Sequence, residues 1–290
     1  MADYSIWVLE YGFLEDCEKR EMIYASQDDE RIHIPYCYVV LKSRENVAMV
    51  DVGFNYKDYG RFLADRAGVR NWRDPATVLS SVGLSPADVD TIFITHAHYD
   101  HFGNVEDFPK AKFYIQEREI AKWTWVMGLP ERMRWMTLAF DPGDILRGVD
   151  LARQQRLTLV DGAMEDALPG IDLHPAHDSH TYGSMWVTVR NDGESWVLAG
   201  DLVYLYDNIK PGGDLSGPEL RYVPVGFGVG SPTNLVLATE EMMKQVDYDV
   251  RRIVPVHEDR IKDHFPSRVT DQGLRVTEIC LARGETSRVR

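Results

Sequence analysis

Apolar stretches of strand length alternate with helix-like segments along the chain, and the predicted strands form two clusters. The first cluster comprises residues 34–43, 47–53, 91–95 and 111–115. The first two ranges are predicted to pair as a hairpin-like unit. The other two are β-branched runs bounded by polar turns, which is typical of buried strands.

The second cluster lies beyond residue 184. Residues 185–190 and 195–199 flank Asn191-Asp192-Gly193-Glu194, in which Asp-Gly is a strong signal for a tight turn between antiparallel strands. Residues 252–256 supply one more strand.

Two helix starts are marked by an N-cap residue followed by proline, at Asp74-Pro75 and at Ser231-Pro232. After the second start, apolar residues recur at helical spacing, at Leu235, Ala238, Met242 and Val246. This stripe predicts a helix face that packs on the core rather than a cofactor site.

Two β-rich halves, each accompanied by helices, predict an α/β protein in which two sheets pack face to face and helices cover them. The expected fold is a four-layer αββα sandwich. With 290 residues and 44% apolar content, the chain is long enough for a sizeable core. Because no repeat or low-complexity tract interrupts it, we expect a single domain over residues 1–290.

Composition limits the partners and the cellular compartment that we expect for this protein. The 46 acidic residues outnumber the 32 basic ones, so the net charge of −14 would repel nucleic acid. The three cysteines, Cys17, Cys37 and Cys280, are too few and too far apart for a disulfide framework, which favours a reducing compartment. There is no signal-like start and no apolar run of roughly 18 residues, so we expect a cytoplasmic protein without membrane contact.

The most informative segment is Thr95-His96-Ala97-His98-Tyr99-Asp100-His101, which directly follows a predicted strand. Neutral imidazole and carboxylate oxygen are ligands for zinc and related divalent ions. In an extended backbone His96 and His98 project to the same side, while Asp100 and His101 fall on the next turn. Since one ion could not easily use all four, we predict two ions, one on each pair. The alternative is a polar loop with incidental histidines.

This segment resembles the His-x-His-x-Asp-His signature of the metallo-β-lactamase superfamily. Three later segments are similar to the remaining motifs of that superfamily: residues 179–184 (Ser-His-Thr-Tyr-Gly-Ser), 198–201 (Leu-Ala-Gly-Asp) and 254–257 (Val-Pro-Val-His). The resemblance implies a first ion held by His96, His98 and His180, a second held by Asp100, His101 and His257, and Asp201 bridging the two. Because His96, Asp201 and His257 each follow a predicted strand, we expect the ligands to meet at one edge of the sandwich.

A narrower resemblance concerns Tyr204, three residues after Asp201. A tyrosine in this position is similar to the N-acyl homoserine lactonase and pyridoxolactonase branch, as are residues 35–41 and the Asp-x-Gly turn of residues 50–53. The resemblance covers about residues 34 to 258. It implies a catalytic role for Tyr204.

Two features depart from the family pattern. Ser179 replaces the usual glycine before the third histidine, and His174-Pro175-Ala176-His177-Asp178 replaces a plainer Thr-Pro-Gly. The sequence assigns no role to His177 and Asp178, and we interpret His174, His177, His33 and His264 as polar residues outside the ligand set. The tail over residues 268–290 has no counterpart.

Function follows from the resemblance together with the chemistry of two metal ions. We expect a hydrolase that opens a lactone ring, an acyl homoserine lactone or an aromatic-fused lactone, by attack of a metal-bound hydroxide. Tyr204 would donate a hydrogen bond to the developing negative charge, and Asp100 would carry a proton to the leaving alkoxide. The expected cofactors are two divalent ions, zinc foremost, with manganese, iron or cobalt as alternatives. The expected partner is a small-molecule lactone or ester.

Other functions share the same ligands. A thioesterase of the glyoxalase II kind and a hydrolase of cyclic amides or other esters remain open, whereas a nuclease is disfavoured by the acidity of the chain. A non-enzymatic alternative is an idle metal-binding scaffold protein. The sequence does not determine the oligomeric state, and a homodimer remains open.

Two insertions, around residues 118–156 and 205–232, are predicted to form a cap over the metal edge. The first is rich in large side chains: Trp123, Trp125, Met127, Met133, Trp135, Met136, Leu138 and Phe140. The second contains Tyr222 and Phe227. These side chains either line a substrate pocket or anchor the cap to the sandwich.

Overall fold

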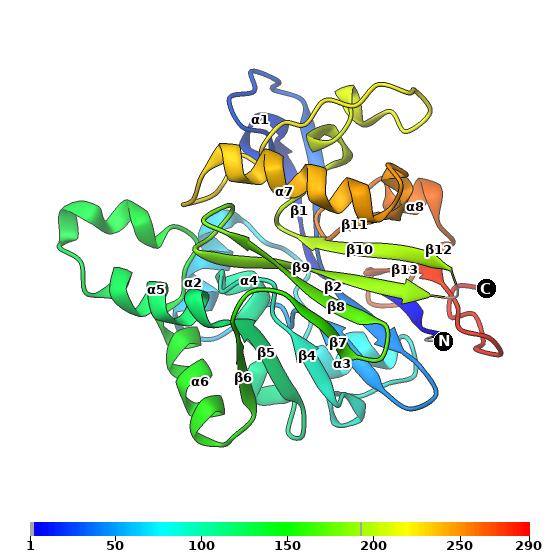
Figure 1. Ribbon diagram of the computed structural model, residues 1–290, viewed down its shortest axis with the longest axis horizontal. Helices are drawn as coiled ribbons and strands as arrows, with labels where there is room; N and C mark the ends of the chain where they lie inside the picture. Colours follow the sequence, from blue (N-terminus) through cyan, green and yellow to red (C-terminus); the bar gives the residue numbers. More distant parts are fainter. Residues whose placement is uncertain (1–2, 192) are drawn as a thin grey trace.

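Two β-sheets dominate the fold (Figure 1). The computed structural model describes residues 3–191 and 193–290. Within these residues the larger sheet has the order β12-β13-β1-β2-β3-β4-β5-β6 and the smaller sheet has the order β11-β10-β9-β8-β7. The strands of the larger sheet are β1 (Ser5–Glu18), β2 (Arg31–Lys42), β3 (Val47–Val50), β4 (Thr91–Phe93), β5 (Lys112–Gln116), β6 (Leu157–Val160), β12 (Ser267–Val269) and β13 (Arg275–Cys280). Those of the smaller sheet are β7 (Met164–Leu168), β8 (Ile171–His177), β9 (Gly183–Asn191), β10 (Glu194–Gly200) and β11 (Ile253–Pro255).

Helices cover the outer faces of the two sheets (Figure 1). Helix α7 contacts β8 and β10 of the smaller sheet, whereas α3 contacts β1 and α6 contacts β6 of the larger one. The α-helices are α1 (Lys19–Met22), α2 (Asp58–Ala67), α3 (Pro75–Ser80), α4 (Tyr99–Phe102), α5 (Glu117–Met127), α6 (Pro142–Arg153), α7 (Pro232–Gln245) and α8 (Ile261–His264). Short 3₁₀ helices lie at Pro86–Asp88, Val105–Asp107, Glu131–Thr137, Tyr206–Asn208, Pro211–Gly213 and Val250–Arg252.

Alternation along the strands builds one core between the sheets and another beneath the helices. In β2, Val39 and Leu41 belong to the same buried cluster as Val187 and Leu198 of the smaller sheet. The intervening Val40 belongs to the cluster that packs with the helices. Because side chains alternate across a strand, one apolar run serves both layers. The predicted α/β sandwich of sheets and helices is confirmed.

Most of the predicted strands are present. β2 and β3 pair antiparallel, although β3 ends at Val50 and leaves residues 51–53 as a loop. β9 and β10 pair antiparallel from Val187↔Leu198 to Asn191↔Glu194, as the Asp-Gly signal predicts. Asp192 of that turn lies outside the described residues.

Both predicted helix starts are confirmed. The Asp74 side chain accepts a hydrogen bond from the backbone N–H of Thr77 at 3.0 Å, and Ser231 accepts one from that of Asn234 at 3.3 Å. Each thereby satisfies a backbone donor at the start of its helix. The apolar stripe of the second helix is buried, as predicted.

The strands that the sequence analysis missed include two that extend the larger sheet, β1 and β13. β1, a strand of 14 residues, pairs antiparallel with both β2 and β13. The tail over residues 268–290, which had no predicted place, supplies β13 and so returns to the sheet formed by the first half of the chain. The division into two β-rich halves is therefore wrong for this tail. The pairing depends on a partner more than two hundred residues away, which no local pattern reveals.

Cys17 and Cys37 are free and buried, and Cys280 is free and partly buried. Among the helices of the described residues, none combines the length and the apolar character that a bilayer crossing requires.

Candidate metal centre

Four of the predicted ligands lie on the connection that follows β4. His96 and His98 follow the end of the strand, and the backbone at His98 is extended (φ −69°, ψ 155°). Asp100 and His101 lie in the short helix α4 that begins directly afterwards. The change from extended to helical backbone turns the two pairs in different directions, as their spacing predicts. All four side chains are buried.

The smaller sheet supplies the other three predicted ligands. His180 lies between β8 and β9, Asp201 follows β10, and His257 follows β11. Because β10 and β11 are parallel, their carboxyl ends reach the same edge of the sheet. Gly200 has φ +51°, and a Cβ there would lie 2.8 Å from the Thr95 hydroxyl, so a glycine is needed where β10 meets the histidine-rich loop.

The Asp201 carboxylate lies between two groups of histidines. Its Oδ2 is 3.5 Å from Nε2 of His96 and 3.3 Å from Nε2 of His180. Its Oδ1 is 3.1 Å from Nε2 of His101 and 3.3 Å from Nε2 of His257. One oxygen thus faces each group, which is the arrangement expected of a bridging carboxylate.

His98 and Asp100 complete the two groups. Nδ1 of His98 lies 2.9 Å from Nε2 of His180, and Oδ2 of Asp100 lies 3.6 Å from Nε2 of His101 and 3.7 Å from Nε2 of His257. Within each group the candidate ligand atoms all lie within 4.8 Å of one another. We call His96, His98, His180 and Asp201 the first set, and Asp100, His101, His257 and Asp201 the second set. The structure thus brings all seven predicted ligands together, in the predicted division.

Unpartnered polar atoms at this point fit a cation. Among the described residues, the buried atoms without a hydrogen-bond partner include Nε2 of His96, His98 and His101, Nδ1 of His180 and Oδ1 of Asp201. Buried polar atoms normally have a partner, because desolvation without one is costly. Nε2 of His96, Nε2 of His101 and Oδ1 of Asp201 lie where the two sets meet. Imidazole and carboxylate donors in this number suit divalent ions such as zinc.

The electrostatics of the centre favour ligand protonation states at His96, His98 and Asp201. Burial and the neighbouring His101 lower the pKa of His96 well below its usual value, and burial and His180 do the same for His98. For Asp201, burial acts to raise the pKa, but the surrounding histidines outweigh it and hold the pKa well below its usual value. Neutral imidazole and ionised carboxylate are the forms that bind a metal. At His101 and His257 burial acts to lower the pKa, but Asp201 and Asp100 outweigh it and raise the pKa, so a bound cation would have to displace a proton there.

Several ligands are oriented by hydrogen bonds on their far side. Nδ1 of His101 lies 2.7 Å from Oδ2 of Asp51, and Nδ1 of His257 lies 2.8 Å from the backbone carbonyl of Pro35. Asp51 also accepts from the backbone N–H and the hydroxyl of Thr95, at 2.7 and 2.8 Å. Such contacts fix the tautomer and the direction of the ring, leaving Nε2 free to face the centre.

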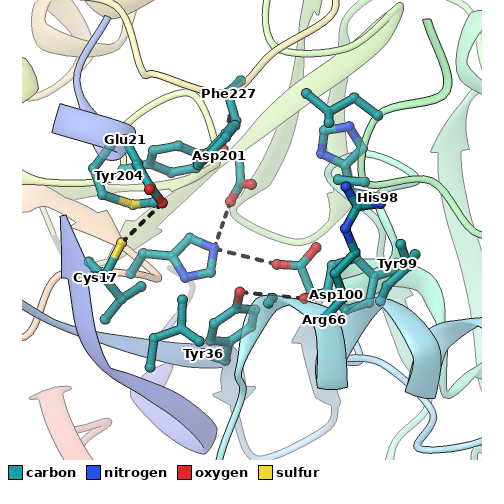
Figure 2. A pocket seen from close by; sticks show the side chains of 18 of the residues that line it. Cys17, Glu21, Tyr36, Arg66, His98, Tyr99, Asp100, Asp201, Tyr204 and Phe227 are labelled. Atoms are coloured by element: carbon teal, nitrogen blue, oxygen red, sulfur yellow. Dashed lines mark hydrogen bonds and ion pairs between the residues drawn. The ribbon is translucent and has the colours of Figure 1, made fainter. Parts of the chain in front are cut away.

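A cavity of about 860 Å³ opens onto the centre (Figure 2). Its floor includes His98, Asp100, Asp201 and His257, with Tyr204 beside them. The rest of the lining is mixed and comes from five places: the β1–α1 region and β2 (Leu14, Cys17, Glu21, Met22, Ile34, Tyr36), α2 (Tyr59, Leu63, Arg66, Ala67), the first residue of α4 (Tyr99), the loop at Phe227, and the segment after α5 (Glu131, Arg134, Trp135, Thr137, Leu138, Ala139). A cavity of this size and character suits a small organic ligand.

Tyr204 lies over the centre. Its ring packs edge-on against those of His180 and His257, with centroids 5.7 and 5.4 Å apart. Its hydroxyl donates to the backbone carbonyl of Phe227 at 3.4 Å, a long hydrogen bond. Burial and the nearby Asp201 raise the pKa of Tyr204 well above its usual value, so the phenol keeps its proton.

The large side chains of residues 118–156 divide between the two predicted roles. Trp123 is fully buried and stacks on Phe140, with ring centroids 4.2 Å apart, so it anchors this segment. Trp135 lines the cavity although it is 65% exposed. Trp125 is half exposed and is not among the residues that line the cavity.

The unassigned polar residues contact groups outside the two sets. Nε2 of His177 lies 3.1 Å from the side-chain carbonyl of Gln116, and Asp178 forms an ion pair with Arg118. His174 stacks on Trp186, with ring centroids 5.0 Å apart. These contacts agree with the interpretation of both histidines as polar residues outside the ligand set.

The positions of His33 and His264 are also consistent with that interpretation. The His33 ring packs near Phe13, with centroids 4.9 Å apart, and His264 packs near Tyr206 at 5.7 Å. Neither belongs to a group of candidate ligand atoms in the described residues.

Sequence reasoning missed two carboxylates next to the centre, Asp51 as a partner of His101 and Glu119 as a partner of the ligand loops. Asp51 was noted only as part of a turn. Glu119 shares the buried face of α5 with Trp123 and Val126, at positions i, i+4 and i+7. A charged residue within an apolar helical stripe is the signal that could have identified it.

Comparison with known proteins agrees with this geometry. The family model for the metallo-beta-lactamase superfamily matches residues 32–257. A probable metallo-hydrolase of Mycobacterium tuberculosis is 28% identical over 179 residues, covering 58% of this chain and 57% of that protein. The N-acyl homoserine lactonase AiiB of Agrobacterium fabrum is 29% identical over 143 residues, covering 46% of this chain and 47% of that protein. The chain thus spans about half the length of these curated relatives.

Among solved structures, the dizinc quorum-quenching lactonase AidC in complex with its product superposes with a TM-score of 0.63 at 17% identity, covering 94% of both chains. This likeness concerns the fold. The family match extends over most of the sequence and includes all seven residues of the two sets. The chain belongs to the metallo-β-lactamase superfamily.

Proposed function

We propose that this member of the metallo-β-lactamase superfamily is a metal-dependent hydrolase that opens the ring of a small lactone. The observation that carries the proposal is the pair of ligand sets joined by Asp201 at the floor of a cavity, with the Tyr204 phenol beside them. An acyl homoserine lactone and an aromatic-fused lactone are the candidate substrates. The relationship to a curated N-acyl homoserine lactonase supports this class of ester.

In this proposal the first and second sets each hold one divalent ion. Zinc is the leading candidate because histidine and carboxylate suit it and because a structural neighbour is a dizinc enzyme, while manganese, iron and cobalt accept the same ligands. When bound, the ions supply Lewis acidity and lower the pKa of water toward roughly 7. For this purpose the chain orients His101 through Asp51 and His257 through the Pro35 carbonyl.

Tyr204 is the proposed hydrogen-bond donor to the carbonyl oxygen of the substrate. Its pKa is raised, so it remains a phenol at neutral pH. Its contact with the Phe227 carbonyl is long at 3.4 Å, so little is lost when the hydroxyl turns to a substrate. A donor placed where negative charge develops lowers the barrier, because the charge gains more from it in the transition state than in the ground state.

Asp100 is the proposed proton carrier. Its carboxylate belongs to the second set and also borders the cavity, so it can reach both an attacking water and a leaving group. In the overall reaction an oxygen from water bonds to the lactone carbonyl carbon, the ring C–O bond breaks, and the water proton passes through Asp100 to the alkoxide. We propose direct hydrolysis without an acyl-enzyme, so solvent oxygen-18 is expected in the new carboxylate.

The cavity supplies the proposed substrate-binding surface. Apolar residues such as Leu14, Met22, Ile34 and Leu63 line it, as does Trp135 on the segment after α5. We propose that residues around 118–156 and 205–232 form the cap, the first through Trp135 and the second through Phe227. Mixed apolar and polar walls suit a lactone, which carries an ester group on an otherwise apolar framework.

The test is a pH-stat hydrolysis screen of short acyl, long acyl and aromatic lactones with metal-reconstituted protein. A thioester, a cyclic amide and a phosphodiester serve as comparison substrates. We expect turnover to be fastest on a lactone and kcat of Tyr204→Phe to fall by roughly 10- to 100-fold on it, since a hydrogen bond to a charged group contributes about 1.5–3 kcal/mol.

The comparison substrates decide between the alternatives. Faster turnover of the thioester or the cyclic amide would replace the lactonase assignment with that chemistry. Binding of two ions without turnover of any class would favour a metal-binding scaffold. An unchanged kcat in Tyr204→Phe would remove the tyrosine from the proposed mechanism.

A further inference from the structure

We propose that Glu119 is a positioning residue for the first set, and that it holds the two chain segments carrying His96, His98 and His180 at their mutual distance. The inference rests on the ligand sets of the proposed function but not on the identity of the substrate. Glu119 contacts no reacting group in this proposal. It acts through the backbone of the ligand loops.

Glu119 uses both carboxylate oxygens, and each oxygen accepts two hydrogen bonds. Oε1 accepts from the backbone N–H of Ala97 at 2.8 Å and from the indole N–H of Trp123 at 2.7 Å. Oε2 accepts from the hydroxyl of Thr181 at 2.9 Å and from the backbone N–H of Gly183 at 2.5 Å. The side chain is fully buried. Protein donors thus occupy the acceptor sites of the carboxylate.

Three of the four donors lie on the segments that carry the histidines of the first set, and the fourth, Trp123, lies on α5 itself. Ala97 stands between His96 and His98, and Thr181 directly follows His180. One carboxylate therefore connects the loop after β4 with the loop before β9, which come from different sheets. None of its four donors belongs to the segments around Asp201 or His257.

The backbone at the start of β9 lies very close to the backbone of Glu119 in α5. A Cβ on Gly183 would lie 2.4 Å from the backbone nitrogen of Glu119 and 2.9 Å from its Cα, so only glycine allows β9 to begin so close to α5. Trp123, which donates to Glu119, also packs near the His98 ring at a centroid distance of 5.8 Å. The carboxylate thus holds the backbone at Ala97 and at Gly183. It also holds the Trp123 ring that packs near His98.

The chemistry of the contact makes Glu119 difficult to replace. A buried carboxylate is costly unless its hydrogen bonds are complete, and here two backbone amides, an indole and a hydroxyl complete them. Burial raises the pKa of Glu119, and the four donors act in the opposite direction. Its place in the first turn of α5 adds the favourable end of the helix dipole. Glutamine has one acceptor oxygen and one N–H₂ group. In either orientation of the amide, the N–H₂ group would face two donors that now bind a carboxylate oxygen.

The test measures zinc affinity in two backgrounds, by competition with a chromophoric chelator. His257→Ala disables the second set, so a single ion reports on the first, whereas His180→Ala disables the first. In the His257→Ala background we expect Glu119→Gln to lower zinc affinity by roughly 10- to 100-fold, the range for contacts that orient metal ligands. In the His180→Ala background we expect a change of less than about threefold, because none of the four donors to Glu119 lies next to a residue of the second set in the chain.

Two further variants keep the experiment decisive. Glu117→Gln removes the same charge from an exposed position two residues earlier in α5 and is expected to leave both affinities unchanged. Thr181→Val removes one donor while keeping the glutamate, and is expected to weaken the first set by a smaller factor than Glu119→Gln. Urea unfolding of each metal-free variant reports folding separately from metal binding.

The outcomes separate this inference from the proposed function. Equal losses in both backgrounds, or a loss of unfolding free energy without a change in zinc affinity, would mean that Glu119 has only a structural role. Wild type that bound no divalent ion would overturn the proposed function itself. Two bound ions in wild type and an unaffected first set in both Glu119→Gln and Thr181→Val would overturn the inference alone.

Discussion

The contact between Asp51 and His101 allows a quantitative prediction about the second set. Asp51 is fully buried and accepts hydrogen bonds from the Thr95 backbone N–H, the Thr95 hydroxyl and Nδ1 of His101. Asp51→Asn keeps the shape of the side chain but turns one acceptor oxygen into a donor. Two orientations of the new amide are available, and each leaves a different conflict.

If the amide oxygen remains near His101, the new N–H₂ opposes the Thr95 backbone N–H, which lay 2.7 Å from the carboxylate. A buried donor without an acceptor costs about 1–3 kcal/mol. If the amide turns over, the N–H₂ faces Nδ1 of His101, which must then become an acceptor. The ring proton moves to Nε2, the nitrogen that faces Asp201 at 3.1 Å, and that tautomer cannot bind a metal through Nε2.

We therefore expect Asp51→Asn to lower the unfolding free energy of the metal-free protein by about 1–3 kcal/mol. Zinc affinity of the second set should fall by roughly 10- to 100-fold. The assays are urea unfolding and chelator competition in the His180→Ala background, in which the second set is intact. Asp16→Asn, at a side chain that is 74% exposed, is the matched control and should change neither quantity.

An unchanged zinc affinity in Asp51→Asn, with the protein folded, would refute the tautomer argument. Because Thr95 also lies 3.0 Å from Nδ1 of His96, a smaller effect on the first set is expected as well. A larger loss at the first set than at the second would show that Asp51 acts mainly through Thr95.

Three further predictions follow from burial and cavity lining. Trp135→Ala should raise KM for the best substrate several-fold, whereas Trp125→Ala should leave the kinetics unchanged, because only Trp135 lines the cavity; equal effects in steady-state assays would contradict this assignment. Met242→Ala, at a buried position of α7, should lower the unfolding free energy by about 2–5 kcal/mol in urea unfolding, whereas Leu237→Ala, at an exposed position, should lower it by less than about 0.5 kcal/mol. Similar values for the two variants would show that α7 is not packed as described. Metal removal with a chelator should abolish hydrolysis, and readdition of zinc should restore it. The melting temperature should fall and recover in the same way, because a ligand that binds only the folded state stabilises it. Hydrolysis that survived complete metal removal would exclude the proposed mechanism.

The sequence determined much of the candidate site because its ligands are clustered in short motifs. Four of them lie within six consecutive positions, at His96, His98, Asp100 and His101, so the local backbone alone places them close together. Strand ends and the Asp-Gly turn were also readable locally, since apolar alternation and turn chemistry depend on neighbouring residues. The two helix starts at Asp74 and Ser231 belong to the same class of local signal.

Contacts that join distant segments were decided only by the tertiary structure. No local pattern indicated that β13 would return to β1, that Asp51 would meet His101, or that Glu119 would accept from the segments on both sides of the first set. The same holds for Trp125 and Trp135, which look alike in sequence but differ in whether they reach the cavity. A residue type records which hydrogen bonds and contacts a side chain can make, whereas the partner it meets depends on how the two sheets and their helices pack.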